Sequence, residues 1–156
     1  MGDLQARSAM CYEYMKELNQ FRAHPVKDEF SLRMLALEIL ELTNRAGYSW
    51  FPICDKDERE IGFFVVSMKC PSADVIFEHN YVDPAFRRQG YSRRIHEAFI
   101  EGYAFPAVYG VTLFKKNTAE KKFISDLVKR HGGTFLDEGL PTKYPELKFY
   151  RFLLTR

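Results

Sequence analysis

The amino-acid sequence predicts one mixed α/β domain over residues 1–156, with a helical part at 1–46 and a mixed sheet at 48–155. Hydrophobic residues make up 46% of the chain and charged residues 28%, which is a globular composition. The apolar period changes from helical to strand-like near residue 48. Strands and helices alternate after residue 73, and this order favours parallel strands joined by a right-handed crossover.

Composition and charge argue against several classes of protein. The net charge of +2 gives no global field for a nucleic-acid partner, so any bound anion must be held locally. The first twenty residues contain charged side chains and no secretory core, and no apolar run reaches the ~18–20 residues of a membrane helix. The cysteines have no metal or redox spacing: Cys11, Cys54 and Cys70. We therefore expect reduced thiols, no metal site and a cytoplasmic protein without membrane contacts, and homodimer formation is left open.

The N-terminal part predicts two helices separated by a break at Pro25. Residues 4–21 form the first helix, whose core stripe is Cys11, Met15 and Leu18. Residues 27–45 form the second, and Gly47 stands where a C-terminal cap belongs. We expect most of the wide apolar face of this second helix to be buried: Phe30, Met34, Leu35, Leu37, Ile39 and Leu42.

The next part of the chain predicts three strands. Residues 48–54 and 60–69 flank the polar loop 55–59 and form a hairpin. Pro52 lacks a backbone donor, so we expect the first of these strands to lie at a sheet edge or to carry a bulge. Residues 73–82 form the third strand.

The remaining residues predict two helices and three strands. Residues 90–103 have helical spacing, with Tyr91, Ile95, Ala98, Phe99 and Gly102 on one face. Residues 107–114 are a near-continuous apolar run, which is typical of a strand covered on both faces. Asn117 begins another helix, whose core stripe is Phe123, Ile124, Leu127 and Val128. Residues 134–137 and 147–154 complete the sheet.

The stretch 81-YVDPAFRRQGYSRRIHEAFI-100 concentrates four arginines in a nearly neutral chain. It leads from a strand into a helix, and a helix N-terminus offers unpaired N–H groups with partial positive charge. Gly90 permits close approach because it has no Cβ, and Arg87 and Arg88 can bond phosphate oxygens. These features predict a pyrophosphate cradle, and the alternative is an arginine-rich solvated helix cap.

The same turn resembles the acyl-CoA-binding signature of the GNAT superfamily of N-acetyltransferases, Arg/Gln-x-x-Gly-x-Gly/Ala, which reads RRQGYS here. The hairpin at 57–66 and the helix after Asn117 are also similar to that family, and about residues 48–155 fit its order of elements. The resemblance implies that acetyl-CoA lies between the strands at 73–82 and 107–114. The implied binding residues are Tyr81, Val82, Arg87, Arg88, Gln89, Gly90, Tyr91, Ser92 and Asn117.

Three features depart from the family pattern. Ser92 stands where Gly or Ala is usual, and it is small enough to keep the approach to the turn open. Ile124 occupies the place of a tyrosine that is often found in the family, so a phenolic general acid is missing there. The family's first strand is not evident, because residues 1–26 are predicted to be helical.

The candidate base is Glu78, which lies four residues before Val82 and is expected on the same strand face. The family often places an acid–base residue at this position, and a carboxylate could take an amine proton directly or through water. The alternative is a structural glutamate paired with a lysine. Tyr144, in the loop 138–146, could replace the missing phenol. His79 is expected on the opposite face from Glu78, where a structural role is favoured.

Polar groups near the helix that follows Asn117 have two interpretations each. Asn117 could bond the pantetheine arm of CoA, and it is also a good N-cap. Four lysines lie around it, and we expect most of them to form a solvated helix face. One of the four could contact the 3′-phosphate of CoA: Lys115, Lys116, Lys121 or Lys122.

The resemblance implies an enzyme that moves an acetyl group from acetyl-CoA to a primary amine of a small molecule or protein. The alternative is a catalytically inactive GNAT-like domain that binds acyl-CoA or a protein partner. A nucleic-acid module is disfavoured because the aromatic residues are not interleaved with the basic ones. The sequence does not identify the amine acceptor.

Overall fold

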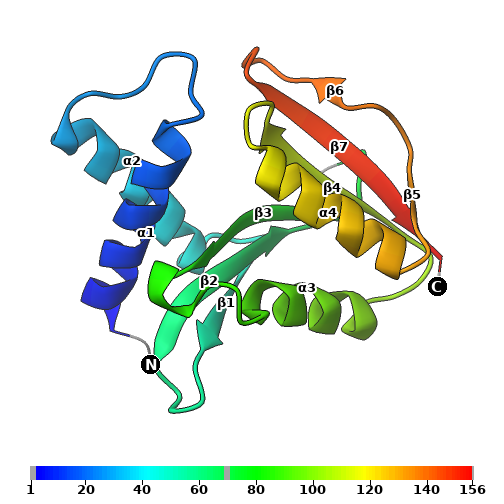
Figure 1. The fold of residues 1–156 in the computed structure, drawn as a ribbon, viewed down its shortest axis with the longest axis horizontal. Helices are drawn as coiled ribbons and strands as arrows, with labels where there is room; N and C mark the ends of the chain where they lie inside the picture. The colour runs from blue at the N-terminus through cyan, green and yellow to red at the C-terminus, as the bar shows by residue number, and fades with distance from the viewer. Residues whose placement is uncertain (1–2, 69–70, 156) are drawn as a thin grey trace.

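The structure is a computed structural model that describes residues 3–68 and 71–155. Over these residues a seven-stranded mixed sheet has the order β1-β2-β3-β4-β7-β5, and β6 also pairs with β7 (Figure 1). The strands are β1 (Tyr48–Cys54), β2 (Glu60–Ser67), β3 (Val75–Val82), β4 (Ala107–Phe114), β5 (Thr134–Phe135), β6 (Leu140–Pro141) and β7 (Leu147–Leu154). The helices are α1 (Leu4–Asn19), α2 (Glu29–Glu41), α3 (Tyr91–Gly102) and α4 (Thr118–Arg130).

The predicted order of elements is confirmed, with small differences at their ends. The second helix is shorter than predicted, because a 3-10 turn, η1 (Leu42–Asn44), replaces its last residues before Gly47. Residues 138–146, expected as a loop, contain the short strand β6. The end of the predicted strand at 60–69 and the thiol of Cys70 lie outside the described residues.

Strand β1 lies at one edge of the sheet, as Pro52 predicts. It pairs antiparallel with β2, and its register shifts between Ile53 and Cys54. A proline at an edge leaves no inner ladder bond unmade, so this position accommodates the residue at little cost.

The parallel ladder between β3 and β4 is short. Only Val75–Phe77 of β3 have partners on β4, at Tyr109–Val111. Strand β4 pairs with β7 along its whole length instead. The sheet therefore opens between residues 79–82 of β3 and 112–114 of β4, and we call this opening the wedge.

A β-bulge in β3 accounts for the wedge. Phe77 lies opposite Val66 of β2. His79 lies opposite Val65, the very next residue, so Glu78 is an extra residue without a partner on β2. A bulge bends its strand and increases the local twist, and β3 therefore turns away from β4 after this point.

Helices cover both faces of the sheet, and β2 is buried between them. Phe63 and Val65 pack with α1 and α2 on what we call the α1–α2 face. Phe64 and Val66 pack with α3 and α4 on the α3–α4 face. Figure 1 shows the pair α1 and α2 beside β1–β3, with α3 and α4 in front of the sheet. Burial on both faces is the main source of stability for these strands.

Helix α2 buries a narrower stripe than the sequence predicts. The expectation that most of its apolar face is buried is wrong, because Phe30 is 74% exposed, Met34 46% and Leu37 41%. The buried residues follow one helical stripe against α1 and the sheet: Leu32, Ala36, Ile39 and Leu40. A helix that packs along one side leaves its remaining apolar residues in solvent.

Helix α3 buries the predicted face only in part. Tyr91, Ile95 and Phe99 of that face pack partly buried against the core, whereas Ala98 and Gly102 are exposed. The fully buried residues are His96 and Ile100. The difference arises because a polar residue, His96, occupies the centre of the contact with β2 and β3. No helix of the described residues is long and apolar enough to cross a membrane.

Replacing Gly62 by alanine is expected to destabilise the fold. A Cβ at this position in β2 would lie 2.1 Å from the carbonyl oxygen of Tyr81 and 3.0 Å from Cα of Val82. Both are backbone atoms, so β3 itself would have to move, and overpacking of this kind costs about 1–3 kcal/mol. Urea unfolding followed by circular dichroism measures the loss.

The matched control is Gly102→Ala, where no other atom lies within 4 Å of the new Cβ. Alanine is the better helix former, so this variant should be unchanged or more stable by up to about 1 kcal/mol. Equal unfolding midpoints for the parent and Gly62→Ala would contradict the close approach of β2 and β3.

Candidate functional site

The wedge exposes one edge of β3. The N–H of Asp83 donates to the carbonyl of Ile61 on β2 at 2.8 Å. Amide groups alternate in direction along a strand, so those of Val82 and Asn80 face away from β2, toward the wedge. There the carbonyl of Val82 accepts a hydrogen bond from Nε of Arg87 at 2.7 Å, and on this side no strand of the described residues pairs with residues 79–82 of β3. The N–H of Val82 is therefore available to an extended ligand, whereas that of Asn80 donates to the hydroxyl of Tyr14.

The N-terminus of α3 opens beside this edge. Gly90 is its N-cap with φ of 81°, and within the described part of the chain no side chain caps the helix. The first N–H groups of α3 are therefore free donors at the positive end of the helix dipole. In the first turn, Oγ of Ser92 accepts a hydrogen bond from Nδ2 of Asn80 at 3.0 Å. This bond holds the turn that is predicted to bind pyrophosphate against the exposed edge of β3. It is made by the hydroxyl of Ser92, the residue that stands where Gly or Ala is usual.

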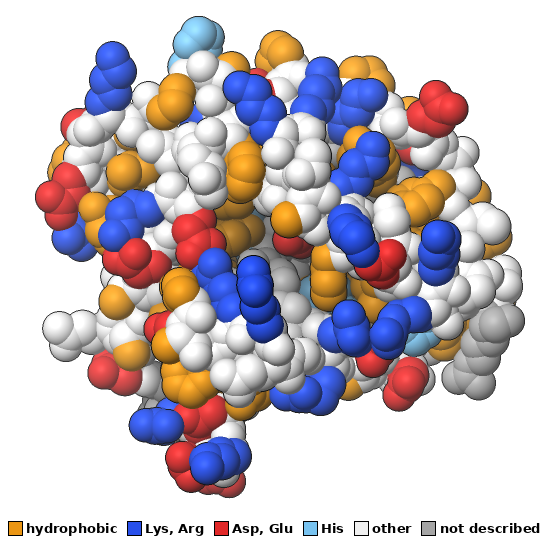
Figure 2. Space-filling view, viewed as in Figure 1, with side chains coloured by type: hydrophobic (Ala, Val, Ile, Leu, Met, Phe, Trp, Pro, Cys, Tyr) orange, Lys and Arg blue, Asp and Glu red, His pale blue; other side chains and the backbone are white. Residues whose placement is uncertain are grey.

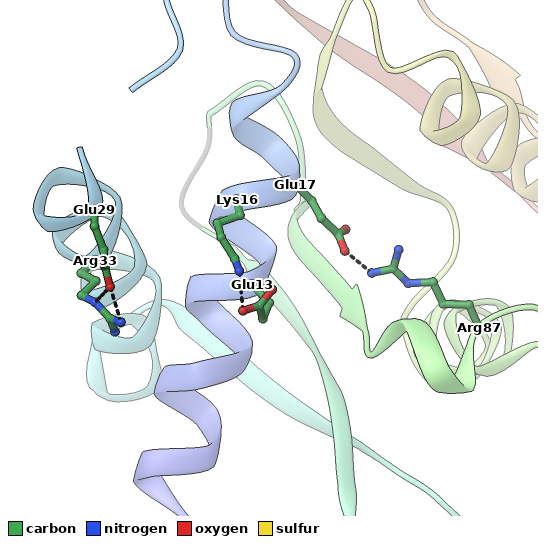
Figure 3. A network of polar contacts seen from close by, with 6 residues as sticks. All are labelled: Glu13, Lys16, Glu17, Glu29, Arg33 and Arg87. Carbon is green, nitrogen blue, oxygen red and sulfur yellow. Dashed lines mark hydrogen bonds and ion pairs between the residues drawn. The ribbon is translucent and has the colours of Figure 1, made fainter. Parts of the chain in front are cut away.

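The guanidinium group of Arg87 contacts other side chains of the protein. Its Nη2 atom lies 2.6 Å from Oε1 of Glu17, and Figure 3 shows it reaching from the turn after β3 toward α1. Its Cζ atom lies 5.5 Å from the centroid of the Tyr81 ring, which is itself 3% exposed. Arg87 thus joins α1 to the turn. Phosphate binding by Arg87 stays a prediction, and it would compete with the ion pair to Glu17.

The other side chains of the turn lie at the surface. Arg88 has φ of 61°, and its side chain and that of Gln89 are exposed. Arg94 donates from Nη1 to the carbonyl of Gln89 at 2.9 Å and covers the ring of Tyr91, with Cζ 4.7 Å from its centroid. Arg88 is therefore the arginine of the predicted motif that is free to meet an anion.

A hollow lies near the centre of the molecule, between α1 and α4, and Lys and Arg side chains gather along its lower and right sides (Figure 2). Four lysines just before α4 and in its first turns are exposed: Lys115, Lys116, Lys121 and Lys122. Basic side chains around a concave surface raise the local concentration of anions. This charge is local, because the whole chain carries only +2.

Because of the bulge, Glu78 and Val82 lie on opposite faces of β3, so the prediction that they share a face is wrong. Oε1 of Glu78 accepts a hydrogen bond from Oγ of Ser67 at 2.5 Å. Ser67 follows Val65 by two residues on β2, so both face α1 and α2, whereas Val82 packs on the α3–α4 face. His79 also faces α1, and its predicted opposite orientation is wrong too. Burial raises the pKa of Glu78, and the Ser67 hydroxyl opposes this shift.

A phenol and an imidazole meet at the exposed edge of β3. The hydroxyl of Tyr14, on α1, lies 3.3 Å from Nδ1 of His79, and the backbone N–H of Asn80 donates to the same phenol oxygen. Burial, followed by the charge of Glu120, raises the pKa of Tyr14, and Glu17 adds to the effect. Burial lowers the pKa of His79 to about 4. At neutral pH the phenol is therefore protonated and the imidazole uncharged.

Helix α4 contributes one cap and one carboxyl group. Oδ1 of Asn117 accepts a hydrogen bond from the N–H of Glu120 at 3.2 Å, which confirms the capping interpretation, while a ligand contact by Asn117 stays a prediction. Burial raises the pKa of Glu120 to about 6. Ile124 is 1% exposed and packs in the core, so it brings no polar group to the wedge. Tyr144 lies on the turn between β6 and β7, half exposed, and its predicted role stays a prediction.

Four polar residues of this region were not singled out from the sequence: Tyr14, Asn80, His96 and Glu120. Asn80 alone had a usable signal, since it lies two residues before Val82 and thus on its face. Tyr14 stands on the apolar side of an ordinary amphipathic helix, where its hydroxyl is no more distinctive than any other. Its neighbour in the structure is His79, 65 residues away in the chain, and no local pattern indicates that contact.

Comparison with known proteins gives similarity in structure alone. No family model and no curated protein matches the sequence. A Corynebacterium glutamicum protein described as histone acetyltransferase HPA2 and related acetyltransferase is 12% identical, with a TM-score of 0.70 over 99% of this chain and 92% of that one. A GNAT-family acetyltransferase from Staphylococcus aureus Mu50 is 14% identical, with a TM-score of 0.62 over 99% and 98% of the two chains. Diaminobutyrate acetyltransferase EctA from Paenibacillus lautus, in complex with L-2,4-diaminobutyric acid and coenzyme A, is 10% identical, with a TM-score of 0.56 over 98% and 92%. These likenesses confirm the predicted fold.

His96 lies under the wedge, between the sheet and α4. It is 1% exposed, and its ring packs against those of Phe64, Phe77 and Phe123. Its Nδ1 donates to the carbonyl of Ser92 at 2.7 Å. Burial lowers the pKa of His96 to about 4, so the native protein holds it neutral.

The free energy of unfolding is expected to fall as the pH drops from 6.5 to about 4, because His96 and His79 take up protons in the unfolded chain but stay neutral in the native protein. The full effect of His96 is on the order of 3 kcal/mol, and His79 adds an effect of the same sign. Glu78 and Glu120, whose pKa values are raised, give smaller contributions of opposite sign. Urea unfolding across this pH window should therefore show a flatter profile for His96→Gln than for the parent.

The control is His24→Gln, because His24 is exposed in the connection between α1 and α2. This variant should keep the parental pH profile. Parallel profiles for the parent and His96→Gln would contradict a neutral, buried His96.

Proposed function

We propose that this chain, which has the fold of the GNAT acyltransferases, is an acyl-CoA-dependent N-acyltransferase that moves an acetyl group from acetyl-CoA to a primary amine of a small molecule or protein. The observation that carries this proposal is the unpaired edge of β3 beside the uncapped N-terminus of α3. An extended thioester with a pyrophosphate at one end suits this pair of features. A strand edge can bond the amide groups of its arm, and a helix N-terminus can bond its phosphates.

Comparison supports the choice of cosubstrate. The Paenibacillus lautus acetyltransferase of the same fold is known in complex with coenzyme A. The chemistry of this chain suits the same ligand, because Gly90 keeps the approach to α3 free of a Cβ and the surrounding side chains are basic. Arg88 can add a charge-assisted bond to a phosphate oxygen.

The acyl end of the ligand would lie along residues 80–82 of β3. Acetyl-CoA supplies the acyl group in activated form, as a thioester. The N–H of Val82 faces the wedge and can stabilise negative charge that develops on the acyl oxygen. The rigid sheet edge and the helix end together fix the donor, and such positioning lowers the barrier by itself.

Glu78 is the proposed base for the amine. It lies on the α1–α2 face, and its raised pKa brings it closer to the operating pH of a general base. An amine that enters from this face could lose its proton to the carboxylate directly or through one water. The hydroxyl of Ser67 fixes the orientation of the carboxylate.

CoA is expected to stabilise the protein, and Gly90→Ala should remove this effect. At about a hundredfold above its dissociation constant, a ligand adds about 2.7 kcal/mol, which raises the melting temperature by several degrees. A Cβ at Gly90 would occupy the space through which the phosphates approach the helix end. Thermal denaturation of both proteins, with and without CoA, gives the comparison.

The matched control is Gly132→Ala, at the end of α4. Gly132 also has a positive φ, of 61°, and no atom lies within 4 Å of the Cβ that alanine would add, so the backbone cost is similar and the site is untouched. This variant should melt earlier than the parent and still gain from CoA. A parent that shows no shift at millimolar CoA would overturn the choice of cosubstrate.

Glu78→Gln should lower turnover by roughly 10²–10⁴, the usual contribution of a positioned base, and leave CoA affinity unchanged. Thiol release from acetyl-CoA in the presence of a panel of amines measures the rate, and calorimetry measures the affinity. Glu101→Gln, an exposed glutamate of α3, is the control and should keep the parental rate. A parental rate in Glu78→Gln would make Glu78 structural. A parent that binds CoA and acylates no amine would leave a binding protein without catalysis.

A further inference from the structure

We infer that Tyr14 of α1 donates the proton to the departing sulfur of the acyl donor, and that His79 positions its hydroxyl. This inference rests on the proposed N-acyltransferase function. The sulfur leaves the acyl carbon more readily when it receives a proton during bond cleavage, because it then departs as a neutral thiol. The reaction therefore benefits from a proton donor beside the exposed edge of β3. Ile124 on α4 is buried and has no proton to give.

The position of the Tyr14 hydroxyl carries the inference. It lies 3.3 Å from Nδ1 of His79 and accepts a hydrogen bond from the backbone N–H of Asn80. That N–H belongs to the edge of β3 that faces the wedge, which is the edge proposed to pair with the thioester arm. The phenol oxygen is therefore within one hydrogen bond of the surface where the acyl donor would lie.

The ring of Tyr14 is fixed by its neighbours. It meets Phe63 edge-to-face at a centroid distance of 5.5 Å, and Tyr81 at 5.9 Å. The imidazole of His79 closes a third side at 5.7 Å. A donor held by three rings and two hydrogen bonds loses little freedom when the reaction occurs. Tyr144, the phenol favoured from the sequence, is half exposed on a turn and has no comparable support.

The surroundings of Tyr14 keep its hydroxyl protonated. The groups that face it are His79 from β3, Glu17 and Cys11 from α1, and Glu120 from α4. Burial and the two carboxylates all raise the pKa of the phenol. His79 is uncharged, because burial lowers its pKa to about 4, and one of its ring nitrogens can therefore accept or donate a hydrogen bond to hold the hydroxyl.

The proposed step balances in atoms and charge. The amine nitrogen forms a bond to the acyl carbon and gives one proton to Glu78. The carbon–sulfur bond breaks, its electron pair stays on sulfur, and the sulfur takes the proton of Tyr14. The resulting phenolate regains a proton through solvent while Glu78 releases one. The net change is one proton moved from amine to thiol, with an amide formed and a thioester consumed.

The first test compares Tyr14→Phe with Tyr12→Phe. Tyr12 lies on another side of α1, with its ring against Arg33 and Lys16. Tyr14→Phe keeps the ring contacts, so we expect it to fold like the parent, with CoA affinity lowered by about tenfold and turnover reduced by roughly 10²-fold or more. Tyr12→Phe should keep the parental rate. Circular dichroism and urea unfolding check that both variants are native.

The second test reads binding and needs no turnover. A hydroxyl that hydrogen-bonds the sulfur of the product thiol should make CoA bind about tenfold more tightly than desulfo-CoA, which lacks the sulfur. Calorimetry should find this difference in the parent and in Tyr12→Phe, and should find it lost in Tyr14→Phe. His79→Phe should weaken the difference, because the hydroxyl loses its support.

The outcomes separate this inference from the function on which it rests. A parent that binds CoA, acylates an amine and is matched by Tyr14→Phe in rate and in the CoA to desulfo-CoA ratio would overturn the role of Tyr14 alone. A parent that binds neither ligand, or releases no thiol with any amine, would overturn the proposed function and this inference together.

Discussion

The β-bulge at Glu78 is the constraint on which the site depends. A strand without it would continue its parallel ladder along β4 and leave no free edge. The extra residue turns β3 away after Phe77, while β4 remains aligned with β7 along its whole length. One inserted residue therefore creates the wedge, presents a backbone donor to it and leaves the candidate base on the face opposite Val82.

Three contacts fix the elements around the wedge, and two of them come from α1. Glu17 binds Arg87 of the turn, and Phe21, just beyond the helix, packs against Phe114 at the end of β4, with ring centroids 6.1 Å apart. The third contact joins Asn80 of β3 to Ser92 of α3. Each contact contributes little free energy by itself; the partly exposed ion pair, for example, contributes at most about 1 kcal/mol. Together they hold α1, the turn and α3 at defined positions around the wedge.

Burial decides the charge state of the groups near the wedge. His79 and His96 are held neutral, the phenol of Tyr14 keeps its proton, and the pKa of Glu120 rises to about 6. Perturbed pKa values of this kind cluster at functional sites, where burial and neighbouring charges set the protonation states of acids and bases. The basic side chains lie instead at the surface around the hollow, where water solvates them and anions can reach them. The molecule thus separates a region suited to proton transfer from a region suited to phosphate.

The sequence by itself determined the order of helices and strands, the edge position of β1 and the glycine turn into α3, because apolar period and turn chemistry are local properties. Only the tertiary structure decided which side chains meet. The bulge that puts Glu78 and Val82 on opposite faces exists through the register between β2 and β3, and a period-two pattern within one strand does not reveal it. Arg87 reaches Glu17 across 70 residues, and Tyr14 reaches His79 across 65. Such contacts depend on how α1 packs against the sheet, and that packing is fixed by the shape of the whole core.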